Sequence, residues 1–367
     1  MSDNSTGEAD SKLAGLRADI DGVDRAIQDL LNKRAGLARA IAEAKHADGE
    51  TADFYRPERE AAVLQKVIER NDGPLPDEEV ARLFREIMSA CLAFQRPLRI
   101  AYLGPAGTFT QAAALKHFGH SVTTAPLGTI DQVFREVEAG EAHYGVVPVE
   151  NSTEGVVTHT LDSFLSSPLK ICGEVSVRIH HYLWSMAPRR EEISVIYSHH
   201  QSLAQCRRWL DDNLPDVVRV GVGSNADAAR RAAAEAGAAA VAGEVAGETY
   251  GLQALAANIE DEPNNTTRFL VVGNREVPST GNDKTTLILS TENRAGALAT
   301  LLQPLSRQDV SMTRIESRPS RRAIWDYVFF IDVLGHQHDA QLCSALDEIR
   351  RQASFLKVLG SYPRAVM

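Results

Sequence analysis

The sequence contains few cysteines and no long hydrophobic run, and each absence excludes a class of protein. The four cysteines, Cys91, Cys172, Cys206 and Cys343, lie far apart and form no CxxC pair, so we expect neither a disulfide scaffold nor a cysteine zinc site. No uncharged apolar stretch reaches the roughly 18 residues that a membrane-spanning helix needs. The polar, acidic N-terminus lacks the basic-then-apolar order of a signal peptide. These absences predict a soluble cytoplasmic protein with no membrane partner.

Positive charge is also in deficit. The 39 Lys and Arg residues against 49 Asp and Glu residues leave a formal net charge of −10 at pH 7. This balance argues against a general nucleic-acid binder but permits local basic pockets. The length of 367 residues predicts two or three domains, at about 100–200 residues per domain. A hydrophobic content of 44% and a charged content of 24% are ordinary for a globular protein.

The N-terminal part of the chain has the pattern of an all-helical domain over residues 12–97. Residues 1–11 are expected to form a disordered lead. No proline interrupts residues 12–46, where apolar residues recur at steps of three and four. A helix of about 35 residues is about 50 Å long, too long for one small bundle to cover, so we expect a partner chain to share it. Two shorter helices are predicted over residues 57–70 and 77–95, and Pro97 marks a boundary.

From residue 98 onward, short β-rich runs alternate with helical runs. This alternation predicts an α/β domain over residues 98–273 with largely parallel sheets, in one lobe or two. The polar segment 274–283 is typical of a linker. Residues 284–361 follow the order strand, helix, strand, strand, helix, strand, which is ferredoxin-like. The sequence therefore predicts a multidomain protein with an all-α, an α/β and a ferredoxin-like part.

Three polar residues, Arg34, Arg59 and Gln95, occupy positions where the helical pattern calls for apolar ones. Buried charge is costly unless it is paired. One such residue is more often a snorkelling side chain, whereas three in a small domain favour a polar cavity. Arg17 and Lys45 are near enough in helical phase to join them. Such a cavity would be cationic and would suit an anionic ligand.

These residues, with the segment Tyr55–Glu60, make residues 12–96 resemble the all-helical chorismate mutase family. The resemblance implies an intertwined homodimer in which Arg17 reaches into the partner's site. It also implies catalytic residues within each chain's own site: Arg34, Lys45, Arg59, Glu60 and Gln95. Chorismate carries two carboxylates, which arginines can clamp, and its rearrangement to prephenate needs no nucleophile. Lys45 and Gln95 would donate to the breaking ether oxygen, and Glu60 would accept the ring hydroxyl.

Three segments of the α/β region place polar groups where strands end or begin. Gly104–Gln111 forms a glycine turn into a helix start, with Thr108 as N-cap. Such helix starts bind anions, although this loop is equally common as plain structure. Glu150 and Asn151 lie together at the carboxyl end of a strand, where ligands bind in α/β sheets. The third segment, Asn265–Phe269, enters a strand.

Residues 98–273 resemble the prephenate dehydratase family because they combine four segments: GPAGTFTQAA, GVVPVENSTEG, Ser198-His-His-Gln and TTRF. The resemblance implies two lobes like a type II binding protein, with the active site in the cleft between them. Prephenate loses carbon dioxide and its ring hydroxyl, which needs a proton to leave as water. The resemblance assigns Thr267 to this step, as a polarising or relaying group. Candidates for substrate binding are Asn151, Ser198, His199, Gln205 and Arg268. Arg268 could hold a carboxylate or form a structural salt bridge, and His199 alone titrates near neutrality.

Two further patterns are weaker. Val220–Ala226 has the GxGxxA spacing of a dinucleotide site, but it lies in mid-domain and Asn225 explains it as a helix N-cap. We therefore expect no nicotinamide or other cofactor. The histidine pairs His180–His181 and His336/His338 have no matching carboxylate pattern, so we interpret them as surface residues and expect no metal.

The C-terminal segment, residues 285–360, resembles an ACT regulatory domain. The motif residues are Gly296, Ala297 and Leu298 at the first strand–helix turn, with Glu316, Ser317, Arg318 and Pro319 on the second strand. In the dehydratase family these motifs bind phenylalanine between paired ACT domains, which implies feedback inhibition. Small residues at the turn let a ligand approach the backbone.

Together, the resemblances predict a bifunctional chorismate mutase and prephenate dehydratase with phenylalanine feedback. The small-molecule partners would be chorismate, prephenate and phenylalanine, with no nucleic acid. The alternative is a non-catalytic metabolite sensor with a binding cleft and an amino-acid-binding ACT domain. The presence of Thr267 and of the cationic residues Arg17, Arg34, Lys45 and Arg59 favours the enzyme over the sensor.

Overall fold

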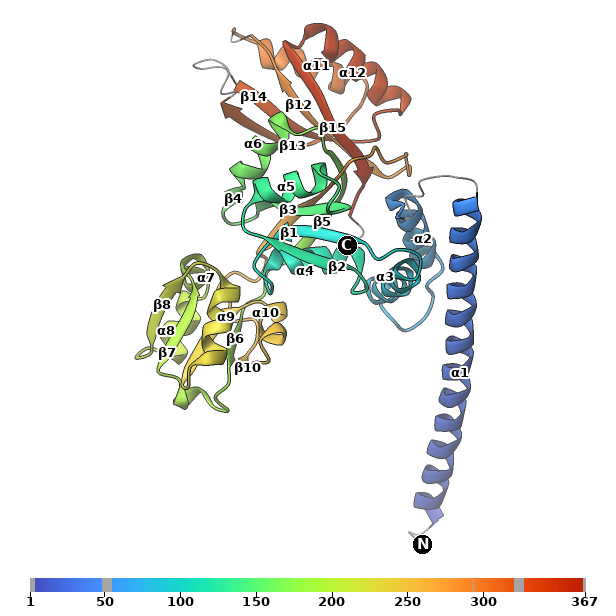
Figure 1. Ribbon diagram of the computed structural model, residues 1–367, viewed down its shortest axis with the longest axis vertical. Helices are drawn as coiled ribbons and strands as arrows, with labels where there is room; N and C mark the ends of the chain where they lie inside the picture. The colour runs from blue at the N-terminus through green and yellow to red at the C-terminus, as the bar shows by residue number, and fades with distance from the viewer. Residues whose placement is uncertain (1–3, 48–54, 293, 320–326, 366–367) are drawn as a thin grey trace.

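The computed structural model describes residues 4–47, 55–292, 294–319 and 327–365, with side chains of the first helix described for residues 10–44. The helical domain contains α1 (Asn4–Ala47), α2 (Pro57–Glu69) and α3 (Asp77–Ala93). The expectation of a disordered lead through residue 11 is wrong, because the helix begins at Asn4 and no proline stops it there. Pro57 and the acidic residues of its first turn favour the start of α2. In Figure 1, α1 projects away from the other domains, with the N-terminus at its far end.

The α/β region forms two lobes. The sheet of the first lobe contains β1 (Arg99–Leu103), β2 (Thr123–Leu127), β3 (Tyr144–Asn151), β4 (Gly155–Val156), β5 (Lys170–Arg178) and β11 (Thr266–Gly273). The strand order is β2-β1-β3-β11-β5, with β4 paired to β3. Its helices are α4 (Phe109–Phe118), α5 (Ile130–Glu138) and α6 (Thr158–Ser166).

The second lobe has the sheet order β10-β6-β9-β7-β8. Its strands are β6 (Tyr182–Ser185), β7 (Val195–His199), β8 (Val218–Val222), β9 (Ala238–Ala242) and β10 (Gln253–Ala256). The helical segments are η1 (Arg190–Glu192), α7 (His200–Gln205), α8 (Arg207–Asn213), α9 (Asn225–Ala234) and α10 (Glu244–Thr249). The expectation of largely parallel sheets is wrong. The chain leaves the first lobe after β5 and returns as β11, which runs antiparallel to both β3 and β5.

The C-terminal domain has the predicted ferredoxin-like order. It contains β12 (Asp283–Ser290), α11 (Ala297–Arg307), β13 (Met312–Pro319), β14 (Tyr327–Leu334), α12 (Ala340–Gln352) and β15 (Phe355–Pro363), in the sheet order β13-β14-β12-β15. Alternate residues of a strand face opposite sides of the sheet. Leu287 and Ile331 accordingly pack in one core with α11 and α12, whereas Ile288 and Phe330 join the core of the first lobe.

The predicted linker is packed against the protein rather than free. Val277 is buried in the core that contains Tyr55 and Phe118. Its carbonyl oxygen lies 2.9 Å from Nε2 of His336, which is itself buried, so the interpretation of His336 as a surface residue is wrong. The C-terminal domain is therefore held to the first lobe by its sheet and by the segment that leads into it.

Candidate functional sites

The helical domain contains a cavity of about 520 Å³, here called the helical pocket. α1 contributes Arg34, the start of α2 contributes Arg59 and Glu60, and the turn after α3 contributes Gln95. Gln95 is oriented by its amide, which donates to the carbonyl oxygen of Ala38 at 2.8 Å. The structure thus brings together four of the residues predicted for this site. The arginines make the pocket suitable for a carboxylate ligand.

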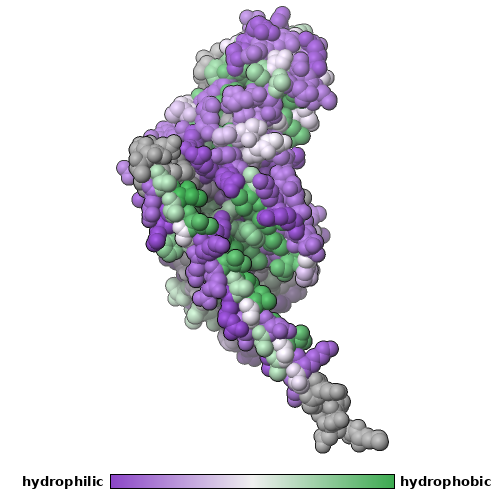
Figure 2. Space-filling model, turned by 90° about the vertical axis from the view of Figure 1, so that its right-hand side faces the viewer, coloured by the Kyte–Doolittle hydropathy of each residue, from purple (hydrophilic) through white to green (hydrophobic). Residues whose placement is uncertain are grey.

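One other predicted residue, Arg17, does not line this pocket. Arg17 lies seventeen residues before Arg34 on α1, which corresponds to about 25 Å along the helix. Lys45 lies near the end of α1, and its side chain is outside the described residues. The apolar stripe of α1 is open to solvent, as the pale and green side chains along the projecting helix show (Figure 2). Its members are Leu13, Leu16, Ile20, Val23, Ile27, Leu30, Leu37 and Ile41, each about half exposed or more. Such a stripe is typical of a helix that packs against another chain.

The carboxyl group of Glu60 is in an unusual environment. Burial raises its pKa from the ordinary value of 4.5 to about 7, and the nearby Arg85 and a hydrogen bond from Tyr55 act in the opposite direction. Nε of Arg85 lies 3.5 Å from Oε1 of Glu60. Glu60 therefore changes its charge close to neutral pH.

Between the two α/β lobes lies a second cavity of about 530 Å³, here called the interlobe cleft. Thr267 of β11 pairs directly with Asn151 of β3, so both side chains lie on the cleft side of the sheet. Nδ2 of Asn151 donates to Oγ1 of Thr267 and to Oδ1 of Asn265, at 2.8 Å each. Oδ1 of Asn151 accepts from the backbone N–H groups of Thr153 and Glu154, at 2.9 Å each, which determines the orientation of the amide.

This network decides where the proton of the Thr267 hydroxyl points. Because Oγ1 of Thr267 accepts from Asn151, its own proton is available for another partner. Among the described residues, no acceptor takes that proton. Thr267 lines the cleft, so its O–H is positioned to donate to a bound molecule.

The second lobe supplies the opposite wall. His199 lies at the end of β7, and its pKa is lowered by partial burial and by the adjacent His200, so the ring is neutral at pH 7. Its backbone N–H donates to Oδ1 of Asn225, which also accepts from the hydroxyl of Ser198. Ser198 is fully buried and bonds the Val241 carbonyl at 2.7 Å, so it supports the wall and does not line the cleft.

Gln205 reaches the cleft beside a histidine that the sequence analysis placed on the surface. Oε1 of Gln205 lies 2.9 Å from Nε2 of His181, which is fully buried and lines the cleft. Burial lowers the pKa of His181, so this ring is neutral. The interpretation of His181 as a surface residue is wrong because the two lobes meet over it.

Arg268 is directed away from the cleft. As the residue after Thr267 on β11, it faces the opposite side of the sheet. Its guanidinium lies 2.8 Å from Glu174, 2.6 Å from Asp332 and 3.0 Å from the hydroxyl of Tyr362. Of the two roles predicted for Arg268, this position supports the structural salt bridge and contradicts binding of a substrate carboxylate. The network joins the first lobe to the C-terminal domain.

Comparisons with known proteins agree with this division of the chain. Three family models match in order: chorismate mutase type II over residues 16–96, prephenate dehydratase over residues 100–277 and the ACT domain over residues 285–351. The bifunctional chorismate mutase/prephenate dehydratase of Stutzerimonas stutzeri is 57% identical over 364 residues, covering 98% of this chain and 100% of that protein. The protein of the same name from Pseudomonas aeruginosa is 55% identical, with 97% and 99% covered.

The chain belongs to the bifunctional chorismate mutase/prephenate dehydratase family. Among solved structures, the prephenate dehydratase of Arthrobacter aurescens in complex with L-Phe matches with a TM-score of 0.67 and 36% identity, over 73% of this chain and 90% of that one. The protein is thus an enzyme in which the helical pocket belongs to the chorismate mutase domain and the interlobe cleft to the prephenate dehydratase domain. None of the helices in the described part of the chain has the length and apolar character needed to span a bilayer.

In the ACT domain of this enzyme the second motif is level with the end of β12, the strand that leads to Gly296, because Ser290 of β12 and Arg318 of β13 both pair with Val328 of β14. Gly296 is the N-cap of α11 with a φ of 76°, a left-handed conformation that favours glycine. Ala297 is buried and Leu298 is half-buried. The second motif, Glu316, Ser317, Arg318 and Pro319, lies on the edge strand β13. Arg318 contacts Asp162 of α6 at 2.8 Å, which links this strand to the first lobe.

Several residues of the cleft were missed by sequence reasoning. Asn225 was interpreted as an N-cap, but Ser224 caps α9 and Asn225 organises the wall through Ser198, His199 and Ser202. Ser224 and Asn225 are adjacent, so the sequence allows either residue to be the N-cap of α9. Only the contact of Asn225 with β7 shows that Ser224 is the cap. Asn265, which precedes TTRF, joins the Asn151 network. A polar residue directly before a strand that carries predicted site residues is the feature of the sequence that could have indicated Asn265.

Proposed function

We propose that the protein converts chorismate to prephenate in the helical pocket and prephenate to phenylpyruvate in the interlobe cleft, with phenylalanine inhibiting through the ACT domain. The observation that carries this proposal is the presence of two separate cavities on one chain, each lined by polar residues suited to one reaction. The first reaction requires a cationic pocket for a dicarboxylate. The second requires a group that can deliver a proton to the departing ring hydroxyl.

In the helical pocket, Arg34 binds a carboxylate of chorismate and Gln95 donates to the ether oxygen as its bond to carbon breaks. Glu60 accepts the ring hydroxyl, which holds the compact conformer in which the new carbon–carbon bond forms. No proton is transferred, so the catalytic effect comes from positioning and from stabilising charge on the ether oxygen. Lys45 is proposed as the second donor to that oxygen.

In the interlobe cleft, the bond between the ring and its carboxylate breaks and carbon dioxide leaves. The electron pair moves into the ring, which becomes aromatic as the ring hydroxyl departs. Thr267 donates a hydrogen bond to that hydroxyl and relays a proton from solvent to it, so that water leaves instead of hydroxide and the threonine hydroxyl is regenerated. Neutral His199 and Gln205 bind the remaining polar groups of prephenate across the cleft.

The helical pocket is proposed to be completed by a second copy of the chain. The exposed stripe of α1 provides the dimer surface, and Arg17 of one protomer reaches the pocket of its partner. The ACT motifs are proposed to bind phenylalanine between paired ACT domains. The complex of the Arthrobacter aurescens enzyme with L-Phe supports this ligand. We also propose a cytoplasmic location.

Separate assays of the two reactions test the proposal. Arg34→Ala should abolish formation of prephenate from chorismate, because the pocket loses a carboxylate ligand, and should leave dehydration of supplied prephenate intact. Equal loss of both activities in a folded variant would contradict separate sites. A purified wild-type protein that forms neither prephenate nor phenylpyruvate from chorismate would favour the metabolite sensor instead.

A further inference from the structure

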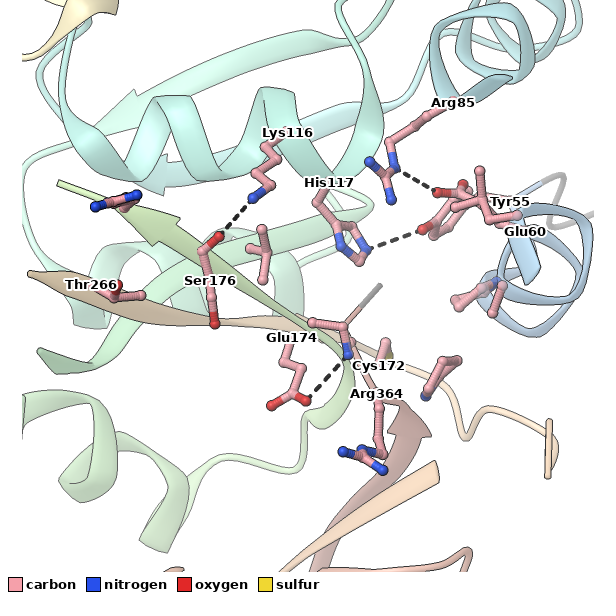
Figure 3. Close-up of a pocket in the computed structure, with 18 residues that line it drawn as sticks. Tyr55, Glu60, Arg85, Lys116, His117, Cys172, Glu174, Ser176, Thr266 and Arg364 are labelled. Carbon is pink, nitrogen blue, oxygen red and sulfur yellow. Dashed lines mark hydrogen bonds and ion pairs between the residues drawn. The ribbon is translucent and has the colours of Figure 1, made fainter. Parts of the chain in front are cut away.

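Glu60 lies in a wall that separates two cavities. One is the helical pocket, and the other is a cavity of about 400 Å³ at the junction of all three domains, here called the junction cavity. Tyr55 and Glu60 line both. Figure 3 shows the junction cavity, with the helical domain contributing Arg85 and the first lobe contributing His117. Residues that belong to the dehydratase domain therefore form part of the surroundings of a residue proposed for the mutase reaction.

The contacts in this wall are specific. Arg85 of α3 lies with Nε 3.5 Å from Oε1 of Glu60, and the two side chains are only 15% and 17% exposed. Nε of Arg85 has no hydrogen-bond acceptor within the described residues, so the ion pair with Glu60 is its main interaction. The hydroxyl of Tyr55 lies 3.1 Å from Nε2 of His117 on α4, and Tyr55 is 4% exposed.

The charges around Glu60 come from every element packed against it. On the side of the helical pocket are Arg34 from α1, Arg56 from just before α2 and Arg59 from α2. On the other side are Arg85 from α3, Lys116 and His117 from α4, Cys172, Glu174 and Arg178 from β5, and Arg364 from the end of the chain. Burial and Arg85 lower the pKa of His117 to about 3, so His117 is neutral and Nε2–H can donate to Tyr55. Tyr55 in turn donates to Glu60. Arg85 is therefore the cation that directly faces the Glu60 carboxylate from this side.

We propose that Arg85 is a positioning residue of the mutase site, and that Tyr55 and His117 extend this support across the domain boundary. Arg85 favours the ionised form of the Glu60 carboxylate and fixes its position in the wall that Glu60 forms between the two cavities. The dehydratase domain thereby completes the wall of the mutase site. This inference rests on the proposed role of Glu60 as the acceptor of the ring hydroxyl.

The test is the pH profile of kcat/KM for the mutase reaction of the full-length enzyme, because this parameter reports the pKa values of the free enzyme. For the wild type we expect activity to rise as Glu60 ionises, with a midpoint near pH 7. Arg85→Gln removes the charge that favours ionisation, so the midpoint should move up by about one pH unit. Activity at pH 7 should then fall roughly fivefold and recover at pH 9. Arg85→Lys should restore most of the wild-type profile.

Matched variants separate this role from a structural one. Arg82→Gln, one turn earlier on α3 and paired with Glu79 on the surface, should leave the profile unchanged. Tyr55→Phe should move the midpoint in the same direction by a smaller amount, and it serves as the test if Arg85→Gln does not fold. Dehydratase activity in each variant checks the fold. A loss that is equal at every pH, or no shift in either variant, would overturn the inference.

Glu60→Gln distinguishes this inference from the proposed function. If the wild-type rise in activity near pH 7 persists in Glu60→Gln, the proposed role of Glu60 fails. If the rise disappears in Glu60→Gln but keeps its wild-type midpoint in Arg85→Gln and Tyr55→Phe, only the positioning role fails.

Discussion

Reversing the polarity of one hydrogen bond should disable the dehydratase reaction. In the native network the Asn151 amide donates to Oγ1 of Thr267, which leaves the hydroxyl proton for the substrate. Asn151→Asp replaces the donor with a carboxylate that can only accept. The hydroxyl of Thr267 then donates to the carboxylate and turns its proton away from the cleft.

The magnitude follows from the proton transfer that is lost. A positioned acid or base contributes about 10²–10⁴-fold to a rate. We therefore expect Asn151→Asp and Thr267→Val each to lower kcat by at least about 10²-fold, which corresponds to roughly 2.7 kcal/mol in the barrier. Thr267→Ser keeps the hydroxyl and should keep most of the activity. Thr267→Val should bind prephenate with little change in KM, because it retains the shape of the side chain.

The assay is formation of phenylpyruvate from supplied prephenate, with mutase activity of the same preparation as the control for folding. Turnover of Thr267→Val within tenfold of wild type would refute the role of its hydroxyl. Normal turnover of Asn151→Asp, with Thr267→Val inactive, would refute the hydrogen-bond direction and leave the role of Thr267 in place.

Three further outcomes are expected. Mixing Arg17→Ala with Arg59→Ala protein should restore part of the mutase activity, because a mixed dimer contains one intact pocket; absence of recovery despite subunit exchange would argue against a shared site. Gly296→Val should strain the left-handed N-cap of α11 and make dehydration insensitive to phenylalanine, measured as activity against phenylalanine concentration; a wild-type inhibition curve would place the effector elsewhere. Arg268→Met leaves the buried Asp332 without its cation, whereas Glu174 keeps its ion pair with Lys284, so the substitution should lower the free energy of unfolding by about 3–5 kcal/mol. Calorimetry should then show a lower Tm, and an unchanged Tm would mean that this network adds nothing to stability.

Much of the fold could be predicted because the spacing of apolar residues along the chain indicates where each helix and strand lies. The strands at Arg99–Leu103 and Ala238–Ala242 begin and end where the apolar runs do. The order of elements in the ACT domain was also predictable, since each amphipathic period specifies one element. In the helical domain, the spacing of Arg34, Arg59 and Gln95 against the apolar stripe was enough to predict a shared cavity, and the structure places all three in it. Local helix geometry determines these faces before any tertiary contact forms.

Other features were decided only by the tertiary structure. The antiparallel insertion of β11 depends on the chain passing through a second lobe and returning, which no local pattern records. His181 is buried because the two lobes close over it, with Phe109 of the first lobe against its ring, which a histidine pair in the sequence does not reveal. Arg85 looks like a surface residue on an amphipathic helix, and it faces Glu60 only because α2 and α3 pack together beside α4. Helical and strand periods determine which residues share a face, whereas the partner of each face depends on contacts between segments far apart in the chain.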